Sequence, residues 1–432
     1  MKIYSFKDLS PEDVDELCLR QLEDDQSIEE RVKTIIGQVK TKGDQALRDY
    51  ALAFDKVALN NLYLGKAEIK AIAATIPADA KTAITQAYGN ISKFHASQIH
   101  KEGAVETMAG VSCWRETRAI ERVGLYVPGG TAVLPSTFLM LAIPAKLAGC
   151  KEITVCSPPQ ADGKTNCYIA FCAELLGIEK IYLAGGAQAI AAMAYGTASI
   201  PKADKIFGPG NRYVTYAKQF IQSHTQTAID MPAGPSEVLV LADETANPSY
   251  VASDLLAQAE HGVDSQAILI STSTELIDQT LEAIESQLEQ LPRRDIAAKA
   301  IANSYAIKVD SMEDGMSFSN TYAPEHLILA TTDYAPLIPL ISNAGSVFLG
   351  NLTPESAGDY ASGTNHTLPT SGYAKAYSGV SIDSFVKKIT FQHITSNGLS
   401  NIGPTVETLA AAEGLQAHKN AITIRLKSQD GY

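Results

Sequence analysis

The chain has 432 residues, of which 45% are hydrophobic and 19% charged, and its formal net charge is −13. This length predicts at least two domains, because a single hydrophobic core stops growing well below it. The acidic balance argues against nucleic acid or a membrane surface as the main partner, although backbone amides could still bind a phosphate locally.

The first quarter of the chain is predicted to be helical. Residues 1–25 form an acidic helical segment without the apolar core of a signal or transit peptide, so a cytoplasmic protein is expected. The following stretch, "SIEERVKTIIGQVKTKGDQAL", places isoleucine and valine at the spacing of one helix face. Residues 26–122 are expected to join residues 237–380 in a first α/β module.

Short apolar strands alternate with helices in residues 123–236, the expected second module. "VGLYV" is followed by "STFLMLAIPAKLAG", "ITVC", "NCYIAFCAELLG", "KIYL", "AQAIAAMAYG", "KIF" and "RYVTYAKQF". This rhythm predicts a parallel sheet covered by helices. Residues 123–145 are uncharged over a membrane-like length, but prolines and glycines interrupt them, which favours a strand, a turn and a buried helix.

Glycine-rich turns follow these strands and suggest a nucleotide-binding edge. The turns are "VPGG", "SPPQADG", "AGGAQ" and "FGPGN". At the carboxyl ends of parallel strands, glycine lets backbone amides approach a phosphate. The chain has no GxGxxG fingerprint, so the turns could equally be tight connections alone.

A second alternating series begins with "EVLVLAD" and includes "QAILIST", "HLILATT" and "SVFLGN". It predicts another α/β module of similar build. Residues 381–432 are too few and too polar to bury a core, so this small tail domain is expected to dock elsewhere.

Polar groups gather around the second series. The helix "NPSYVASDLLAQAEHG" should begin after Asn247 and end near Gly262, with Gln258 and His261 together at its packed edge. Zinc accepts such nitrogen and oxygen ligands, although a histidine there more often caps carbonyls. "YAPEHLIL" holds Glu325 and His326 at the mouth of a buried strand. A solvent-facing pair is the alternative.

The chain resembles the histidinol dehydrogenases over nearly its whole length. The resemblance is carried by "IDMPAGPSEVLVLADETANPSYVASDLLAQAEHGVDSQAIL" together with "RVGLYVPGGTAVLPST", "AGGAQAIAAMAYGT", "FGPGN", "YAPEHL", "SAGDYASGTNHTLPT" and "EGLQAH". It implies a zinc enzyme of histidine biosynthesis that oxidises L-histidinol through histidinaldehyde to L-histidine and reduces two NAD. It also implies a homodimer with active sites shared between subunits, and two Rossmann-like modules that are not standard Rossmann domains.

The resemblance further implies the roles of individual residues. Glu325 and His326 match the family's acid/base pair. The zinc ligands would be Gln258, His261, Asp359 and His418. The substrate contacts would be Ser236, Gln258, His261, His326, Asp359, Glu413 and His418. The NAD contacts would be Tyr126, Gln188 and Asn211.

Elementary chemistry agrees with the implied pair. A histidine whose pKa lies near neutrality can take the alcohol proton while hydride leaves to nicotinamide, and a carboxylate can activate the water that hydrates the aldehyde. Three alternatives stay open: a related dehydrogenase of another alcohol such as a sulfonated diol, a zinc hydrolase in which Glu325 activates metal-bound water, and a non-catalytic sugar- or nucleotide-binding module. Retention of Glu413 and His418 argues against the first, and the glycine turns argue against the second.

Overall fold

A computed structural model describes residues 1–20, 26–129, 133–232 and 234–429 of the chain. The chain divides into two compact units. The first comprises Met1–Gln98 and Glu121–Phe385, and the second comprises Ile99–Ile120 and Val386–Tyr432.

The first unit contains a six-stranded parallel sheet in the order β1-β12-β11-β10-β13-β14. Its four central strands, β12, β11, β10 and β13, are almost wholly buried, as expected where helices cover both faces of a parallel sheet. The strands are β1 (Lys2–Ser5), β10 (Glu237–Ala242), β11 (Gln266–Ser271), β12 (Tyr305–Lys308), β13 (His326–Ala330) and β14 (Ser346–Leu349).

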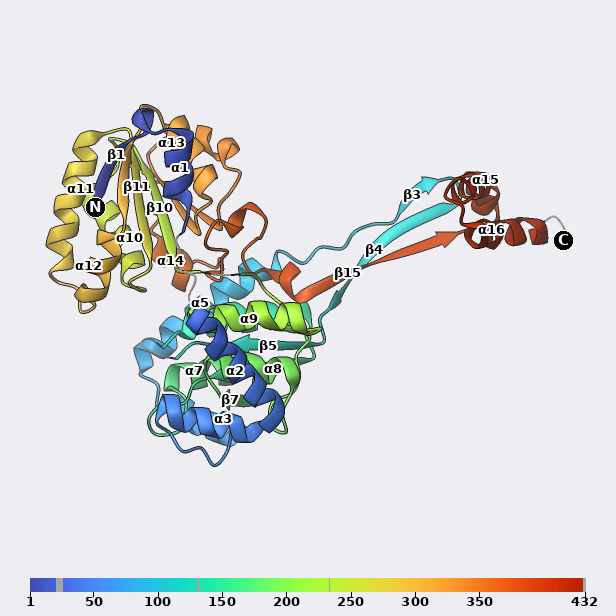
Figure 1. The fold of residues 1–432 in the computed structure, drawn as a ribbon, viewed down its shortest axis with the longest axis horizontal. Helices are drawn as coiled ribbons and strands as arrows, with labels where there is room; N and C mark the ends of the chain where they lie inside the picture. Colours follow the sequence, from blue (N-terminus) through green and yellow to red (C-terminus); the bar gives the residue numbers. More distant parts are fainter. Residues whose placement is uncertain (21–25, 130–132, 233, 430–432) are drawn as a thin grey trace. The chain divides into compact units, whose positions relative to one another are not determined.

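Two hydrophobic cores hold this sheet between its helices. On one face pack α10 (Pro248–Ala259), α11 (Thr274–Leu288) and α12 (Arg294–Ala302). On the other pack α1 (Pro11–Cys18), α13 (Met312–Tyr322) and the 3₁₀ helix η3 (Ala335–Leu340). Figure 1 shows α11 and α12 on one side of β10 and β11, with α1 and α13 on the other.

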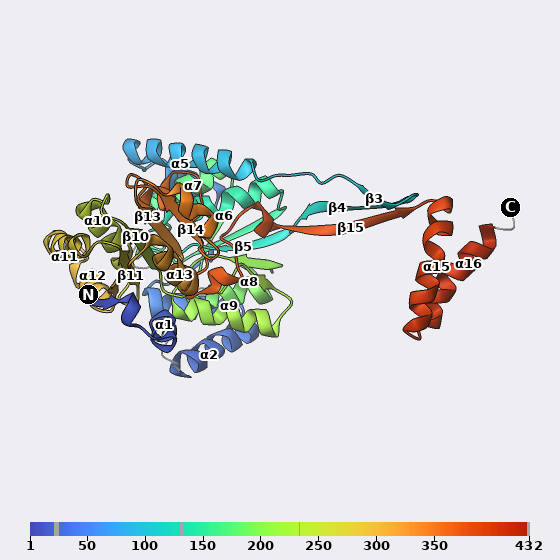
Figure 2. The same ribbon diagram turned by 90° about the horizontal axis from the view of Figure 1, so that it is seen from above.

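A second six-stranded sheet in the same unit has the order β2-β7-β6-β5-β8-β9, parallel except for β2. Its strands are β2 (Tyr63–Gly65), β5 (Arg122–Tyr126), β6 (Glu152–Ser157), β7 (Lys180–Leu183), β8 (Lys205–Phe207) and β9 (Ala228–Ile229). One helical layer contains α4 (Lys66–Ala73), α5 (Ala78–Ala96), α6 (Pro135–Ala148) and α7 (Cys167–Leu176). The other contains α2 (Gln26–Lys42), α3 (Asp44–Tyr50), α8 (Gly186–Tyr195) and α9 (Arg212–His224). Figure 2 shows members of these two layers on opposite sides of β5.

The two sheets share one topology. When the strands are counted from β10 in the first sheet and from β5 in the second, both have the order 3-2-1-4-5, with an N-terminal strand added beside strand 3. This is the order of doubly wound α/β proteins. The predicted α/β class with parallel sheets is therefore confirmed.

The observed domain membership differs from the predicted boundaries. Residues 1–25 were expected to be helical, but β1 is an edge strand of the first sheet, and residues 21–25 lie outside the described chain. Residues 26–98 were expected beside residues 237–380; instead β2 pairs with β7, and α2, α4 and α5 pack on α8, α7 and α6. The sequence pattern identified the helices but carried no information about which sheet they cover.

The second unit also differs from the expected tail, because it includes residues 99–120. A three-stranded antiparallel sheet joins β3 (Val105–Met108), β4 (Val111–Ala119) and β15 (Val386–Ile394), with β4 in the centre. The helices α15 (Ser396–Ala412) and α16 (Gln416–Gln429) follow and pack on each other. Shorter elements complete the chain: η1 (Phe6–Asp8), the π-helix η2 (Ala51–Asp55), α14 (Glu355–Tyr360), η4 (Tyr373–Lys375) and η5 (Ile382–Phe385).

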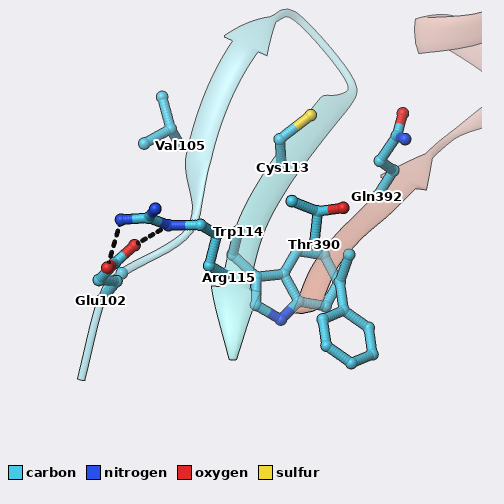
Figure 3. Close-up of a pocket in the computed structure, with 9 residues that line it drawn as sticks. Glu102, Val105, Cys113, Trp114, Arg115, Thr390 and Gln392 are labelled. Carbon is cyan, nitrogen blue, oxygen red and sulfur yellow. Dashed lines mark hydrogen bonds and ion pairs between the residues drawn. The ribbon is translucent and has the colours of Figure 1, made fainter. Parts of the chain in front are cut away.

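The second unit buries very little apolar surface. Among its described residues, the buried hydrophobic side chains are Val111 and Ala410 alone. Its exposed large apolar side chains are Ile99, Val105, Met108, Ile389, Ile394, Leu409, Leu415 and Ile424. An open hollow on the sheet is lined in part by Cys113 and Trp114 (Figure 3), and the Trp114 ring stacks on Phe391 with centroids 5.5 Å apart.

No described helix is both long enough and apolar enough to span a bilayer. The uncharged stretch at residues 123–145 instead contains most of β5 and of α6, and both elements are buried in the second sheet. The prediction of a strand, a turn and a buried helix is confirmed for the described part of this stretch.

Candidate functional site

The Glu325–His326 pair lies at the amino edge of the first sheet. His326 is the first residue of β13, and β13 pairs with β10, so that Val238 lies opposite His326. β10 and β13 are also the strands between which the strand order reverses. Both side chains are buried, with 6% of Glu325 and 3% of His326 exposed. The solvent-facing alternative is therefore wrong.

The backbone of one residue, Glu237, holds both members of the pair through its N–H and its carbonyl. The backbone N–H of Glu237 donates to Oε2 of Glu325 at 2.9 Å, and Nδ1 of His326 lies 3.1 Å from the Glu237 carbonyl oxygen. A carbonyl only accepts, so Nδ1 carries a proton, and Nε2 is the nitrogen left to exchange one. Nε2 lies 3.3 Å from Oδ1 of Asp359.

Three side chains form a cluster that could hold a cation. The ligand atoms of His326, Glu355 and Asp359 all lie within 4.8 Å of one another. Glu355 and Asp359 are four residues apart on α14, so they share one face of that helix. Oε2 of Glu355 is buried without a hydrogen-bond partner among the described residues. Such an unpartnered carboxylate oxygen suits a metal or a substrate amine.

The buried charges shift one another's pKa values. Burial raises the pKa of Glu325 to about 8, although His326 and the Glu237 N–H oppose this. Burial alone would lower the pKa of His326, but the carboxylates of Glu355, Glu325 and Asp359 raise it well above its usual value. Burial would raise the pKa of Asp359, yet its contact with His326 lowers it. The protein thus concentrates negative charge around one imidazole.

The predicted residues of α10 reach this cluster. The Asn247 side chain caps the helix by accepting from the Ser249 N–H at 2.9 Å, as predicted, but the helix ends at Ala259, before the expected Gly262. Gln258 is fully buried. Its amide satisfies both neighbours when its oxygen shares the Glu237 N–H with Glu325, at 2.6 Å, and its nitrogen donates to Glu355. His261 follows the helix.

His261 has an exposed face but senses the cluster. Desolvation of its ring lowers its pKa, and the charge of Asp359 opposes that shift. Ser236 lies just before β10, where its carbonyl accepts from the Gln266 N–H at 3.1 Å. The structure therefore brings Ser236, Gln258 and His261 to the same edge as Glu325 and His326.

Sequence reasoning missed Glu355. It lies in "TPESAGDY", directly after the proline that caps α14 and one helical turn before Asp359. Its spacing of four residues from a predicted ligand was the available signal. Glu413 and His418 belong to the second unit, where Glu413 caps α15, His418 lies in α16, and both are exposed.

The predicted nucleotide residues lie at the carboxyl edge of the second sheet. Tyr126 ends β5, and its hydroxyl accepts from the Gly186 N–H at 3.0 Å. Gln188 is buried in the first turn of α8, and Asn211 caps α9 through its side-chain oxygen. Gly208 has a φ of +130°, and a Cβ there would lie 2.1 Å from the Tyr126 carbonyl oxygen. Only glycine fits this approach. Gly130 of the predicted turn lies outside the described residues.

The doubly wound sheets and the buried Glu325–His326 pair define an α/β protein, and comparison with known proteins identifies it as an oxidoreductase. The family model of histidinol dehydrogenase matches residues 18–426. The chain is 57% identical to histidinol dehydrogenase of Bacteroides thetaiotaomicron over 96% of each chain, and 52% identical to the chloroplastic enzyme of Arabidopsis thaliana over 99% of this chain and 92% of that one. A crystal structure of histidinol dehydrogenase from Elizabethkingia anophelis superposes with a TM-score of 0.96 at 53% identity, covering 100% of this chain and 99% of that one. The chain belongs to the histidinol dehydrogenase family, whose members are NAD-dependent oxidoreductases of histidine biosynthesis.

Proposed function

We propose that the chain oxidises L-histidinol to L-histidine through L-histidinaldehyde, with two NAD reduced in succession. The observation that carries the proposal is the buried Glu325–His326 pair, which is anchored by the backbone N–H and carbonyl of Glu237. Two adjacent acid/base groups of different chemistry suit two consecutive oxidations at one site.

His326 takes the alcohol proton in the first oxidation. Its Nδ1 proton is engaged by the Glu237 carbonyl, so Nε2 of the neutral ring accepts the substrate proton while hydride leaves to nicotinamide. The surrounding carboxylates raise the pKa of His326, and a cation held by Asp359 would offset their charge and so favour that neutral ring. Glu325 then activates the water that hydrates the aldehyde. Its pKa near 8 makes it a stronger base than an ordinary carboxylate and places it close to the working pH. A second hydride transfer from the hydrated aldehyde completes the reaction.

The second sheet is the proposed NAD site, built as a Rossmann-like module without the usual fingerprint. Tyr126 ends β5 and Gly208 directly follows β8, and between these two strands the strand order reverses, where doubly wound proteins bind nucleotides. The capping role of Asn211 engages its side-chain oxygen, so its amide nitrogen would meet the ligand. Gln188 would contribute from the start of α8.

Zinc is the proposed metal, held by Gln258, His261 and Asp359 together with His418. The set offers only nitrogen and oxygen donors, which zinc accepts, and Asp359 already belongs to a cluster able to hold a cation. Bound zinc would supply a positive charge that accepts nitrogen donors of the substrate, so that these four residues would help to position the alcohol carbon.

Metal content tests the proposed ligands one by one. His261→Ala and His418→Ala should each lower bound zinc, whereas His366→Ala should retain it. The control is apt because His366 is also close to the cluster, but its Nε2 is engaged by the Thr137 hydroxyl at 2.9 Å. Metal analysis of purified variants gives the answer, and full zinc occupancy in His261→Ala would remove the site as proposed.

Product stoichiometry tests the reaction. Two NADH should form per histidinol, with no free aldehyde accumulating, because one site holds both acid/base groups. Absorbance of NADH at limiting histidinol, with an aldehyde trap in solution, measures both quantities. One NADH per histidinol and trapped aldehyde would leave a simple alcohol dehydrogenase.

We also infer a homodimer with shared active sites. The second unit exposes eight large apolar side chains and buries only two hydrophobic residues among those described, which is the composition of an interface rather than of an independent domain. Glu413 and His418 lie in this unit and would reach the partner's site. In a two-fold dimer each chain would complete the site of the other.

A further inference from the structure

A buried ion pair involves the side chain of Glu237, the residue whose backbone contacts Glu325 and His326. The Glu237 side chain is 1% exposed, and both its oxygens accept from the Arg20 guanidinium, at 2.8 and 2.9 Å. Oε1 also accepts from the Ser371 N–H at 2.8 Å. The Glu237 carboxylate is thus held from two sides, by the N-terminal segment and by the loop that follows α14.

Arg20 is itself fixed in place. Its guanidinium carbon lies 3.5 Å from the centre of the Tyr322 ring, and Nη1 donates to the Cys18 carbonyl at 2.9 Å. A buried pair of this kind adds little net stability, because desolvation of the two charges offsets their attraction. What a planar, two-pronged contact does supply is a defined geometry for the carboxylate.

Backbone strain gathers at the same place. Three described non-glycine residues have a positive φ. Two of them, Ala323 and Ser371, lie near the Arg20–Glu237 pair, and each has a φ of +54°. Ala323 lies two residues before Glu325, and Ser371 donates to Glu237. Such conformations cost about 1–3 kcal/mol and persist where the surroundings impose them. Two strained residues therefore lie close to Glu237, one before Glu325 and one in contact with the Glu237 carboxylate.

We propose that the Arg20–Glu237 pair positions both Glu325 and His326, because it fixes the Glu237 backbone whose N–H and carbonyl contact them. This inference rests on the proposed two-step reaction. In this arrangement Arg20 and Glu237 are positioning residues that act through Glu325 and His326. Displacement of the Glu237 backbone would disturb the Glu325 carboxylate and the His326 ring together, so both oxidations should be slower.

Separate assays of the two half-reactions test the proposal. Histidinol measures the first oxidation and supplied histidinaldehyde the second. Glu237→Gln and Arg20→Met should each lower kcat of both half-reactions by about 10–10²-fold, because small misplacements of catalytic groups have effects of this size, with KM for NAD unchanged. Arg20→Lys should restore part of the loss, since it keeps the charge but not the two-pronged contact.

Tyr305→Phe is the matched control. The Tyr305 hydroxyl ties the same N-terminal segment to the first sheet by donating to the Leu17 carbonyl at 2.9 Å, without touching Glu237. This variant should lower the melting temperature but leave both kcat values within about 2-fold, because the backbone of Glu237 is not disturbed. Equal kinetic losses in Tyr305→Phe and Arg20→Met would reduce the pair to a general fold contact and overturn the proposal.

Failure of the inference is distinguishable from failure of the proposed function. Glu325→Gln and His326→Asn should each slow mainly one half-reaction, while Glu237→Gln slows both. If the single variants separate as expected but folded, zinc-containing Glu237→Gln has normal kcat, the positioning role is refuted. If the single variants do not separate, the two-step assignment itself fails.

Discussion

His326→Asn should slow oxidation of histidinol by about 10²–10⁴-fold, the usual contribution of a general base. Oxidation of supplied histidinaldehyde should change far less. The reason is that only the first step requires removal of an alcohol proton, and Nε2 of His326 is the nitrogen placed to take it. Asparagine keeps a polar group of similar size but cannot accept the proton.

Glu325→Gln should show the opposite preference. The aldehyde must be hydrated before its second oxidation, and the amide cannot activate water, so the second half-reaction should carry most of the loss. Rapid-mixing measurements of NADH formation from each substrate separate the two effects. Equal losses in both half-reactions for both variants would refute the division between Glu325 and His326.

Two inactive variants should restore activity to each other when they share a dimer. Take His326→Ala and His418→Ala, unfold them, mix them in equal amounts and refold. In a mixed dimer with shared sites, one site collects both defects and the other collects neither. With about half the dimers mixed and one of two sites restored in each, roughly a quarter of wild-type activity should return.

Each variant refolded alone is the control, and it should stay inactive. Subunit exchange is verified with a charge tag on one variant, and zinc is resupplied during refolding. If each site came from a single chain, every site would keep one defect and no activity would return. Proven mixed dimers without recovered activity would place Glu413 and His418 in their own subunit's site.

Local patterns predicted much of the fold because parallel strands and their helices leave strong sequence signals. "VGLYV", "ITVC", "KIYL" and "KIF" correspond to β5, β6, β7 and β8, and the helices between them begin and end close to the predicted residues. Between β13 and β14 the described chain forms only the 3₁₀ helix η3, since two prolines disfavour a regular helix there.

Contacts between distant segments could not be predicted in this way. The packing of α2, α4 and α5 beside the second sheet depends on partner helices far away in the sequence, which hydrophobic periodicity does not specify. Glu355 was overlooked because a carboxylate after a proline reads as an ordinary helix start. Arg20 and Glu237 are separated by 217 residues, so only the folded chain reveals their pairing.

The pairing of β4 with β15 has a consequence for synthesis of the chain. All strands of the second sheet have been synthesised once the chain reaches Ile229. In contrast, β4 can pair with β15 only after synthesis has passed Val386. At typical translation speeds this delay is roughly 15–60 s. During that interval the nascent chain can close the second sheet while β4 presents an open edge, and closure over so long a loop is slow. The second unit therefore completes its sheet late, and until β15 is made the unpaired edge of β4 is open to pairing with other chains.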